Sequence, residues 1–452
     1  MDSLNKSSWA NAKSTKCVMG RREVIRMALG TAAVSLLGAA FPFSTGNAQA
    51  LSAPRIVIVG AGAAGLSAAS RLRDIMPRAS IVLIDSHLQH LFQPGFTLVG
   101  AGVWKPNDVI SATSEYVADG VEWVAEAAAE IDPDANAVTT SSGRLIKYDF
   151  LVVATGLRLD YESIEGMSPE LIGNDGIASI YAGPEAAAAS ASAMMRFAET
   201  GGVGVFGRPA TEMKCAGAPL KYTFITDDQM RRSGRRARAE LIYMAHDDTL
   251  FGVPPVNDKV TELFSERDIQ VRQRHVLEAI DPGIKTAYYK TSEGRVEQPY
   301  DFIHVVPPMR APHVIQASAL PWQDGPFAAD GWIEVDRETL RHRRFANVFG
   351  IGDVNGVPKG KTAASVKSQT PVAVENLVAV AEGREPMAKY NGYTSCPLIT
   401  GVGKAMLVEF DYDGRLTPSF PFIDPLKELW VSWAIEEKAL RPVYFAMLRG
   451  RA

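Results

Sequence analysis

The chain has 452 residues, 46% of them hydrophobic and 22% charged, a composition typical of a soluble globular protein with two or three domains. Its 47 basic and 51 acidic residues give a net charge of −4 without any basic run, which argues against nucleic acid as a partner. The seven histidines form no metal-ligand spacing with cysteine or with one another, so we expect no bound metal.

The first fifty residues have the features of an export signal. Paired arginines, Arg21 and Arg22, precede a mildly apolar run at 27–41, and the small residues at 48–50 form a cleavage pattern. This arrangement predicts a twin-arginine signal peptide and a periplasmic location. A short membrane anchor is the alternative, but about fifteen apolar residues are too few to span a bilayer comfortably.

A dinucleotide-binding pattern follows directly. An apolar strand at 55–59 leads into a glycine-rich turn, a helix at 66–74 and a second strand at 81–84. Such a turn lets a pyrophosphate approach the helix N-terminus, and an acid after the second strand binds a ribose hydroxyl. The residues that we assign to the cofactor here are Gly60, Gly62, Ala64, Gly65 and Asp85.

Two later segments resemble motifs of flavoproteins in the disulfide reductase superfamily. The strand at 151–154 ends in an Ala-Thr-Gly turn, and 348–353 reads VFGIGD, like the second FAD motif of that superfamily. The resemblance implies that FAD is the cofactor and that Asp353 binds its ribityl chain. It adds Thr155, Gly156, Gly352 and Asp353 to the cofactor-binding residues.

Strand-like apolar runs alternate with helical stretches along the chain, which favours α/β layers on parallel sheets. We therefore expect two Rossmann-like three-layer domains of the FAD/NAD(P)-binding disulfide reductase type and a C-terminal amphipathic helical tail. The expected boundaries are 1–50 for the signal, 51–160 with 325–385 for the FAD-binding domain, 161–324 for the second Rossmann-like domain, and 386–452 for the C-terminal region.

The second domain lacks a nicotinamide motif. Its first strand, 203–206, runs into Gly207, Arg208 and Pro209, where a second GxGxxG turn would otherwise stand. A bulky arginine and a proline do not let a pyrophosphate close in. We therefore expect that a nicotinamide is not the electron donor.

Six further segments resemble the sulfide:quinone oxidoreductase family, and the resemblance covers essentially the whole chain after residue 50. It is strongest to the two-cysteine branch that includes the mitochondrial enzymes. The segments are LFQPGFTLVGAG at 91–102, MKCAGAPLK at 213–221, HVVPPM at 304–309, FGIGDV at 349–354, KTAASV at 361–366 and YTSCPLITG at 393–401. The resemblance adds Gln93, Ala128, Pro308, Lys361 and Thr362 to the residues expected to bind FAD.

Cys215 and Cys396 are the expected catalytic residues. They lie too far apart in sequence for a CxxC or zinc motif, but folding can pair them as a redox disulfide beside the flavin. The resemblance implies that Cys396 receives sulfur from hydrogen sulfide and that Cys215 faces the flavin, which passes electrons to a quinone. Spacing alone does not decide between the two roles. The sulfane sulfur acceptor is expected to be a small thiol, sulfite or polysulfide.

The C-terminal region is expected to contact a membrane surface. Leu426, Leu429, Trp430 and Trp433 would fall on one face of a helix, and an apolar stretch follows Pro442. Aromatic and apolar side chains of this kind suit a helix that lies in the membrane interface. Packing on the core, or on a second copy in a homo-oligomer, is the alternative.

Two other functions remain open at this stage. One is the flavoprotein subunit of a flavocytochrome c sulfide dehydrogenase, which passes electrons to a cytochrome; that family has a cysteine in the loop after the ribose-binding acid, and this chain has none there. The other is a non-catalytic FAD-binding scaffold subunit, which would tolerate loss of Cys215 and Cys396.

Overall fold

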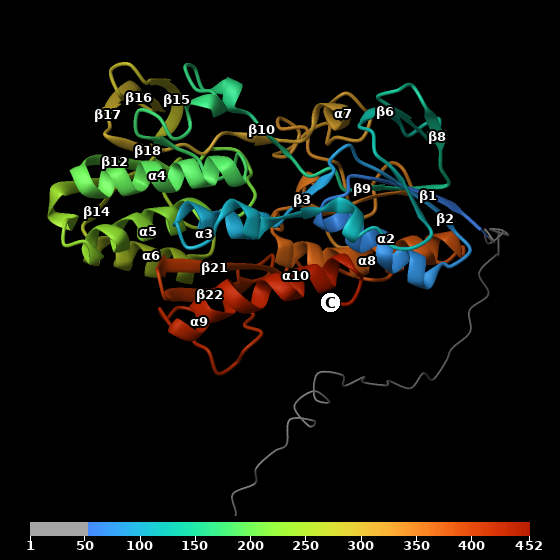
Figure 1. Cartoon of the computed structure of the whole chain (residues 1–452). Coiled ribbons are helices and arrows are strands. Elements are labelled where there is room, and N and C mark those ends of the chain that lie inside the picture. Colours follow the sequence, from blue (N-terminus) through green and yellow to red (C-terminus); the bar gives the residue numbers. More distant parts are fainter. Residues whose placement is uncertain (1–52) are drawn as a thin grey trace, which may run out of the picture. The chain divides into compact units, whose positions relative to one another are not determined.

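The computed structural model describes residues 53–452, so the predicted signal peptide lies outside the described residues. Two five-stranded parallel sheets form the centres of two α/β domains (Figure 1). The first sheet is assembled from distant parts of the chain, because its last strand pairs with β9. Its strands in spatial order are β20 (Val348–Gly350), β9 (Phe150–Val153), β1 (Arg55–Val59), β2 (Ser80–Ile84) and β5 (Val121–Val124).

The first sheet is covered on both faces. Ile56, Val57 and Ile58 of β1 have no exposed surface, as a parallel strand between two layers requires. Two helices lie on one face and a three-stranded antiparallel sheet lies on the other (Figure 1). The helices are α2 (Ala63–Ile75) and α8 (Ala363–Ala381), and the strands are β6 (Ala128–Asp132), β7 (Ala137–Thr140) and β8 (Leu145–Lys147).

The second sheet is built in the same way, with helices and a small antiparallel sheet around it. Its strands are β11 (Ile177–Ala178), β18 (Phe302–His304), β12 (Gly202–Gly207), β13 (Ala239–Met244) and β14 (Ile269–Arg272). The helices are α4 (Pro184–Thr200), α5 (Ala218–Arg232) and α6 (Pro254–Glu266), and the antiparallel strands are β15 (Val276–Asp281), β16 (Thr286–Thr291) and β17 (Gly294–Pro299). The two layered α/β domains confirm the predicted fold class.

Shorter elements complete the two domains. They are β3 (Gln89–Leu91) paired with β4 (Ile110–Ala112), β10 (Arg158–Leu159) paired with β19 (Met309–Arg310), the 3-10 turns η1 (Gln93–Gly95) and η7 (Gly352–Val354), and the short helices α3 (Phe96–Gly100) and α7 (His313–Gln316).

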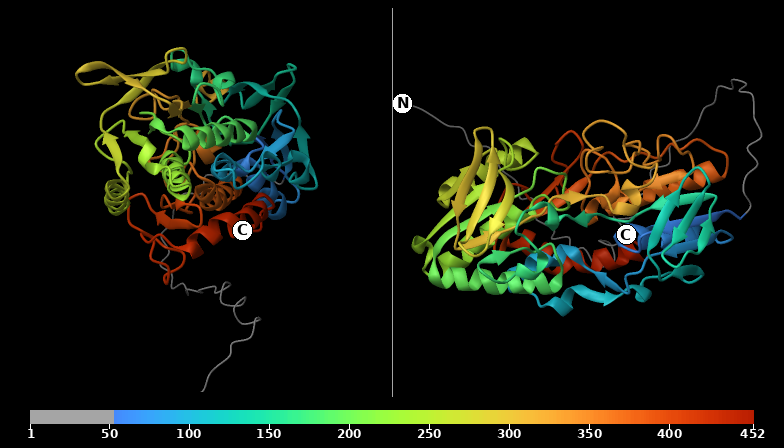
Figure 2. Two further views of the ribbon diagram at one scale, coloured as in Figure 1. Left: turned by 60° about the vertical axis from the view of Figure 1, so that its left-hand side comes forward. Right: turned by 90° about the horizontal axis from the view of Figure 1, so that it is seen from above.

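The C-terminal region joins the two domains. The hairpin β21 (Thr394–Gly401) and β22 (Lys404–Phe410) packs on α5, and the tail then runs through α9 (Trp430–Ala434), the π-helix η8 (Ile435–Ala439) and α10 (Leu440–Leu448) to α2. In Figure 2 these red elements extend from the helices of the second domain to the blue helix of the first. The Tyr444 hydroxyl lies 2.8 Å from His90 Nε2, and Ser70 donates a hydrogen bond to the Leu448 carbonyl at 2.9 Å, so α10 is fixed to the core.

The predicted helical face at 426–433 is wrong in detail, although a helical tail is present. Leu429 is extended and exchanges backbone hydrogen bonds with Ala405 of β22, so the helix begins only at Trp430. Trp433 is buried, whereas Trp430 is 71% exposed. Pairing with a strand edge overrode the helical spacing. None of the helices within residues 53–452 is long and apolar enough to cross a membrane.

Candidate active site

The fold brings Cys215 and Cys396 together. Cys215 lies in the loop between β12 and α5, and Cys396 lies on β21, which packs against α5. Cys396 Sγ lies against Gly217, two residues after Cys215, and both cysteines are free among the residues described. Cys396 is buried and Cys215 is half-buried. Folding therefore brings the two sulfur atoms close together, beside the start of α5.

The loop before α5 holds Cys215 in a strained conformation. β12 ends at Gly207, but α5 begins only at Ala218. Cys215 has a φ of +48°, a left-handed conformation that is costly for a residue with a β-carbon. Its N–H donates to the Lys361 carbonyl at 3.0 Å, and its carbonyl accepts from the Ala218 N–H at 2.8 Å. These two hydrogen bonds fix the sulfur just before the helix N-terminus.

Gly217 makes room for the second sulfur. A β-carbon on Gly217 would lie 2.3 Å from Cys396 Sγ and 3.3 Å from Leu398 Cδ1. The first of these distances is far shorter than any non-bonded contact between carbon and sulfur. The segment 214–219 therefore contains the thiol of Cys215, and its Gly217 leaves space for the thiol of Cys396.

The environment favours the thiolate at Cys215. The thiol of Cys396 donates a hydrogen bond to it, and this lowers the pKa of Cys215 against the effect of burial. The charge of Lys221 and the N–H of Ala218 lower it further. The pKa of Cys396 is raised, because it gives its proton to that hydrogen bond and is buried.

Lys221 and Glu436 are functional candidates that the sequence analysis missed. Both are buried beside the cysteines, with Lys221 Nζ at 3.9 Å from Glu436 Oε1. The charges of Lys221 and Cys215 also attract each other. A charged residue between Leu220 and Tyr222, so close to Cys215 in sequence, could have indicated that Lys221 is functional. Glu436 offered none, since only the fold of the tail brings it to α5.

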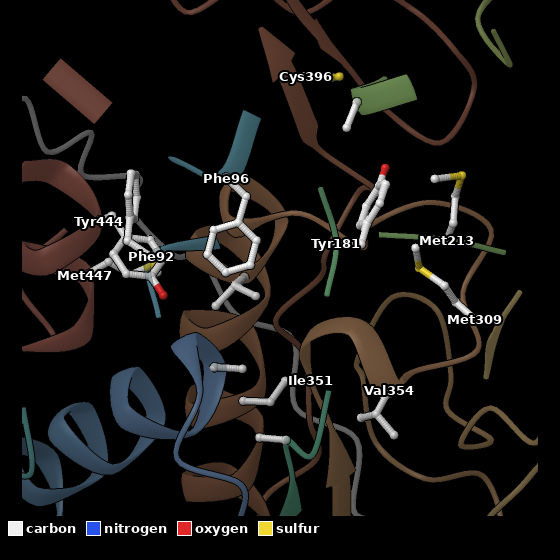
Figure 3. Close-up of a cluster of buried hydrophobic side chains, with 14 of the residues drawn as sticks. Phe92, Phe96, Tyr181, Met213, Met309, Ile351, Val354, Cys396, Tyr444 and Met447 are labelled. Carbon is white, nitrogen blue, oxygen red and sulfur yellow. The ribbon is translucent and has the colours of Figure 1, made fainter. Parts of the chain in front are cut away.

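Tyr181 is a third missed residue. Its hydroxyl donates a hydrogen bond to the Cys215 carbonyl at 3.2 Å. In Figure 3 its ring lies between Phe96 and the two methionines Met213 and Met309, and its hydroxyl points to the side on which Cys396 lies. Tyr181 therefore forms part of the wall next to the sulfur pair.

The glycine-rich turn before α2 leaves space for a phosphate group. A β-carbon on Gly60 would lie 2.3 Å from the Ala154 carbonyl oxygen, and one on Gly65 would lie 1.8 Å from the Gly60 carbonyl oxygen. A β-carbon on Gly62 would meet no described atom within 4 Å. No side chain of residues 53–452 caps α2 at Gly62. The free N–H groups and this open space fit the pyrophosphate of FAD.

Neighbouring polar groups also fit FAD. The Thr155 hydroxyl is buried and has no hydrogen-bond partner in the described part of the chain, which a bound ligand would explain. Gly156 beside it has a φ of +69° and open space where a β-carbon would stand. Asp85 directly follows β2 and accepts a hydrogen bond from the Ala61 N–H at 2.6 Å, so it lies against the same turn.

Lys361 supports the turn that carries Asp353. Its ammonium group donates to the carbonyls of Asp353 and Asn355 at 2.7 and 2.8 Å and lies 3.7 Å from the ring centre of Trp332. Burial lowers the pKa of Lys361 to about 8, against the attraction of Asp353. Burial in turn raises the pKa of Asp353, which follows Gly352 in η7.

Thr362 connects the start of α8 to the strand of the second cysteine. As the N-cap of α8, its hydroxyl accepts a hydrogen bond from the Ser365 N–H at 3.1 Å. The same hydroxyl lies 2.9 Å from that of Thr394 on β21. Because Cys396 follows on that strand, the helix start and the sulfur are held in register.

The other predicted cofactor residues lie in three places. Gln93 accepts a hydrogen bond from Lys214 Nζ at 2.7 Å, next to the cysteine loop. Ala128 begins β6. Pro308 lines a cavity of about 220 Å³ together with Arg208, at the carboxyl ends of β12 and β18. Among residues 53–452, no three His, Cys, Asp or Glu side chains are placed to hold a metal ion.

Comparisons with known proteins agree with this architecture. Residues 54–195 match the family model described as pyridine nucleotide-disulphide oxidoreductase. The mitochondrial sulfide:quinone oxidoreductase of Mus musculus is 35% identical and covers 87% of this chain and 86% of its own. That of Dictyostelium discoideum is also 35% identical, over 88% and 86%. The crystal structure of the sulfide:quinone oxidoreductase from Aquifex aeolicus has a TM-score of 0.72 at 23% identity, over 88% of this chain and 92% of that one.

A fold and cofactor turn of this kind define a flavin-dependent oxidoreductase, and FAD is its cofactor. At 35% identity over most of both chains, this chain belongs to the sulfide:quinone oxidoreductase family. The resemblance that its motifs indicated is confirmed, including the similarity to the mitochondrial enzymes.

The predicted periplasmic location is wrong. The relatives from Mus musculus, Dictyostelium discoideum and Schizosaccharomyces pombe are mitochondrial enzymes, which are not exported by the twin-arginine route. Paired arginines with serines and few acidic residues also occur in organelle-targeting segments, so the N-terminal pattern did not specify the compartment.

Proposed function

We propose that this protein oxidises hydrogen sulfide at Cys215 and Cys396 and passes the electrons through FAD to a quinone. The observation that carries the proposal is the position of Cys396 Sγ against Gly217, in the same loop as Cys215 at the start of α5. The surroundings also favour the thiolate at Cys215. The relatives that cover most of the chain are named for this reaction. The oxidised product is sulfane sulfur bound to cysteine.

The charge of Lys221 supports different roles for the two cysteines. In the oxidised state a disulfide joins Cys215 and Cys396, and hydrosulfide attacks one sulfur while the other leaves as a thiolate. The sulfur whose thiolate is better stabilised leaves faster, and the charge of Lys221 and the Ala218 N–H stabilise the thiolate of Cys215. Attack at Cys396 forms a persulfide there, breaks the bond between the cysteines and leaves the electron pair on Cys215.

FAD, when bound, accepts two electrons from the cysteine pair and gives them to a quinone. We assign its binding to the FAD-binding domain at 51–160 and 325–385, next to the second domain at 161–324 and the C-terminal region at 386–452. The residues that would hold it are Gly60, Gly62, Ala64, Gly65, Asp85, Gln93, Ala128, Thr155, Gly156, Pro308, Gly352, Asp353, Lys361 and Thr362.

The C-terminal region offers a surface for a membrane, where a quinone dissolves. Phe422 and Trp430 are 83% and 71% exposed, and Val431 and Val443 are also exposed. Exposed aromatic and apolar side chains near basic residues suit the interface of a bilayer. A second copy of the chain is the alternative partner for this surface.

The sulfane sulfur bound to Cys396 is finally transferred to a small thiol, sulfite or polysulfide.

The test is sulfide-dependent reduction of a short-chain quinone, compared with cytochrome c, by the FAD-loaded protein. We expect quinone reduction in the wild type and its near-complete loss in Cys215→Ser and in Cys396→Ser. Preference for cytochrome c would favour the flavocytochrome alternative. A flavin that stays oxidised in anaerobic sulfide would favour a scaffold, and full activity in both variants would remove the mechanism.

A further inference from the structure

A buried charged pair lies beside the two cysteines. Glu436 Oε1 is 3.9 Å from Lys221 Nζ, and the side chains are only 5% and 4% exposed. Lys221 lies in the first turn of α5, and Glu436 comes from η8 in the tail. Removing two charges from water costs more free energy than a loose contact returns, so packing alone does not explain this pair.

The carboxylate of Glu436 has few hydrogen-bond partners for a buried charged group. Its Oε2 atom has no hydrogen-bond partner within the described residues. Burial raises the pKa of Glu436 to about 7, Lys221 counteracts this, and the negative charge of Cys215 adds to it. The next residue, Glu437, instead pairs with Lys438 near the surface. Glu436 is held in a π-helix, a distortion that is frequent at functional sites.

The charged groups around Glu436 come from three elements. Lys221 faces it from α5, Cys215 from the loop before that helix, and Cys396 from β21. On its own element, Glu437 and Lys438 pair with each other. Lys221 is the one cation that interacts with both Glu436 and Cys215 in the described part of the chain. Lys221 is therefore the positive charge that Glu436 and Cys215 share.

We propose that Glu436 is the general base that deprotonates hydrogen sulfide, and that Lys221 positions the charge transferred in this step. This inference rests on the proposed function and deepens it. Neutral hydrogen sulfide enters the buried site and gives a proton to the Glu436 carboxylate. The resulting hydrosulfide forms a bond to Cys396 sulfur, the bond between the cysteines breaks, and Cys215 takes the electron pair.

The charges balance at every stage of this reaction. Before it, Lys221 faces the Glu436 carboxylate; after it, Glu436 is neutral and Lys221 faces the Cys215 thiolate. One negative charge has moved between two neighbours of the same ammonium group, and the net charge of the buried site is unchanged. A base with a pKa of about 7 is well matched to proton transfer near neutral pH.

The kinetic test is the rate of flavin reduction by sulfide in Glu436→Gln across pH, with Glu437→Gln as the matched control. Below neutral pH, where most of the sulfide in solution carries both protons, we expect a loss on the order of 100-fold, typical of a missing general base. At alkaline pH the loss should shrink, because hydrosulfide from solution replaces the one made in the site. Glu436→Asp should recover part of the rate, and Glu437→Gln should match the wild type.

A loss of the same size at every pH would indicate a purely structural role and would overturn the inference. The second readout needs no turnover. Chemical reduction of the disulfide should protonate Glu436, seen as a carboxylic acid band in infrared difference spectra that Glu436→Gln lacks. No such band in the wild type would also overturn it. Failure of sulfide to reduce the wild-type flavin would instead refute the proposed function, while the infrared result still tests Glu436.

Discussion

Cys396 Sγ occupies space that the missing side chain of Gly217 leaves free, since a β-carbon there would stand 2.3 Å from the sulfur. The two residues belong to different structural elements, a loop before α5 and the strand β21. The position of the second sulfur is therefore set by the absence of one methyl group.

Gly217→Ala should displace Cys396 while leaving the protein folded. A misplacement of about 1 Å at reacting atoms can cost on the order of 100-fold in rate, and we expect a loss of that size in sulfide-dependent flavin reduction. The control is Gly252→Ala, where a β-carbon meets no described atom within 4 Å. Equal rates in both variants, at equal FAD content, would contradict the assigned role of Gly217.

Lys221→Met should move the thiolate titration of Cys215 to higher pH. A nearby cation favours the charged form, so its removal raises the pKa of Cys215 and lowers the thiolate fraction at neutral pH. Ultraviolet absorbance of the reduced protein across pH measures this. Lys404→Met, on the exposed start of β22, serves as the control and should titrate like the wild type.

The same substitution should also destabilise the fold. Lys221→Met leaves Glu436 buried without its counter-charge, and breaking a buried pair costs about 3 kcal/mol in unfolding free energy. The double variant Lys221→Met with Glu436→Gln should recover most of that loss. Denaturant unfolding of Lys221→Met, Glu436→Gln and the double variant measures it, and additive losses in the double variant would argue against a coupled pair.

Alanine substitutions at two glycines of the cofactor turn should have different effects, one on FAD binding and the other on stability. Gly62→Ala adds a β-carbon to open space in front of α2, so the protein should fold normally but retain little FAD. Gly65→Ala pushes a β-carbon against the Gly60 carbonyl and should destabilise the apoprotein itself. Flavin absorbance and the thermal unfolding midpoint separate the two effects. Full FAD retention in Gly62→Ala would contradict the proposed pyrophosphate position.

Phe422→Ser with Trp430→Ser should weaken binding to lipid vesicles. Both side chains are largely exposed in the C-terminal region, and each substitution removes apolar surface that a bilayer interface would cover. Co-sedimentation with vesicles measures the change. Ile284→Ser is the control, because Ile284 is 65% exposed but lies in the second domain. An unchanged vesicle affinity together with a change in oligomeric state would favour a second copy as the cover.

The sequence predicted the parts of the site that are local. The glycine turn at 60–65 and Asp85 are separated by one helix and one strand, so their spacing alone indicates how they meet. The cysteine segments at 213–221 and 393–401 were found as motifs, but their contact depends on β21 packing against α5. Family resemblance, rather than spacing, indicated that pairing.

The rest of the site required the fold. Glu436 reaches the cysteines only because the tail crosses from β22 to α2, and no sequence pattern marks that path. Tyr181 donates its hydrogen bond to the backbone carbonyl of Cys215. Because every residue type has such a carbonyl, the sequence gives no sign of this contact. Lys361 remains a predicted FAD-binding residue, and two carbonyls of the Asp353 turn hold its ammonium group, a local geometry that spacing does not encode.

The hydrogen bond from the Cys215 N–H to the Lys361 carbonyl links the two halves of the molecule at one peptide. The backbone of Cys215, in the second domain, is therefore held by the residue that precedes the N-cap of α8 in the first domain. A substitution that shifts the first turn of α8 would misalign Cys215 without touching it, and would present as slow sulfide chemistry in a protein with an intact flavin spectrum.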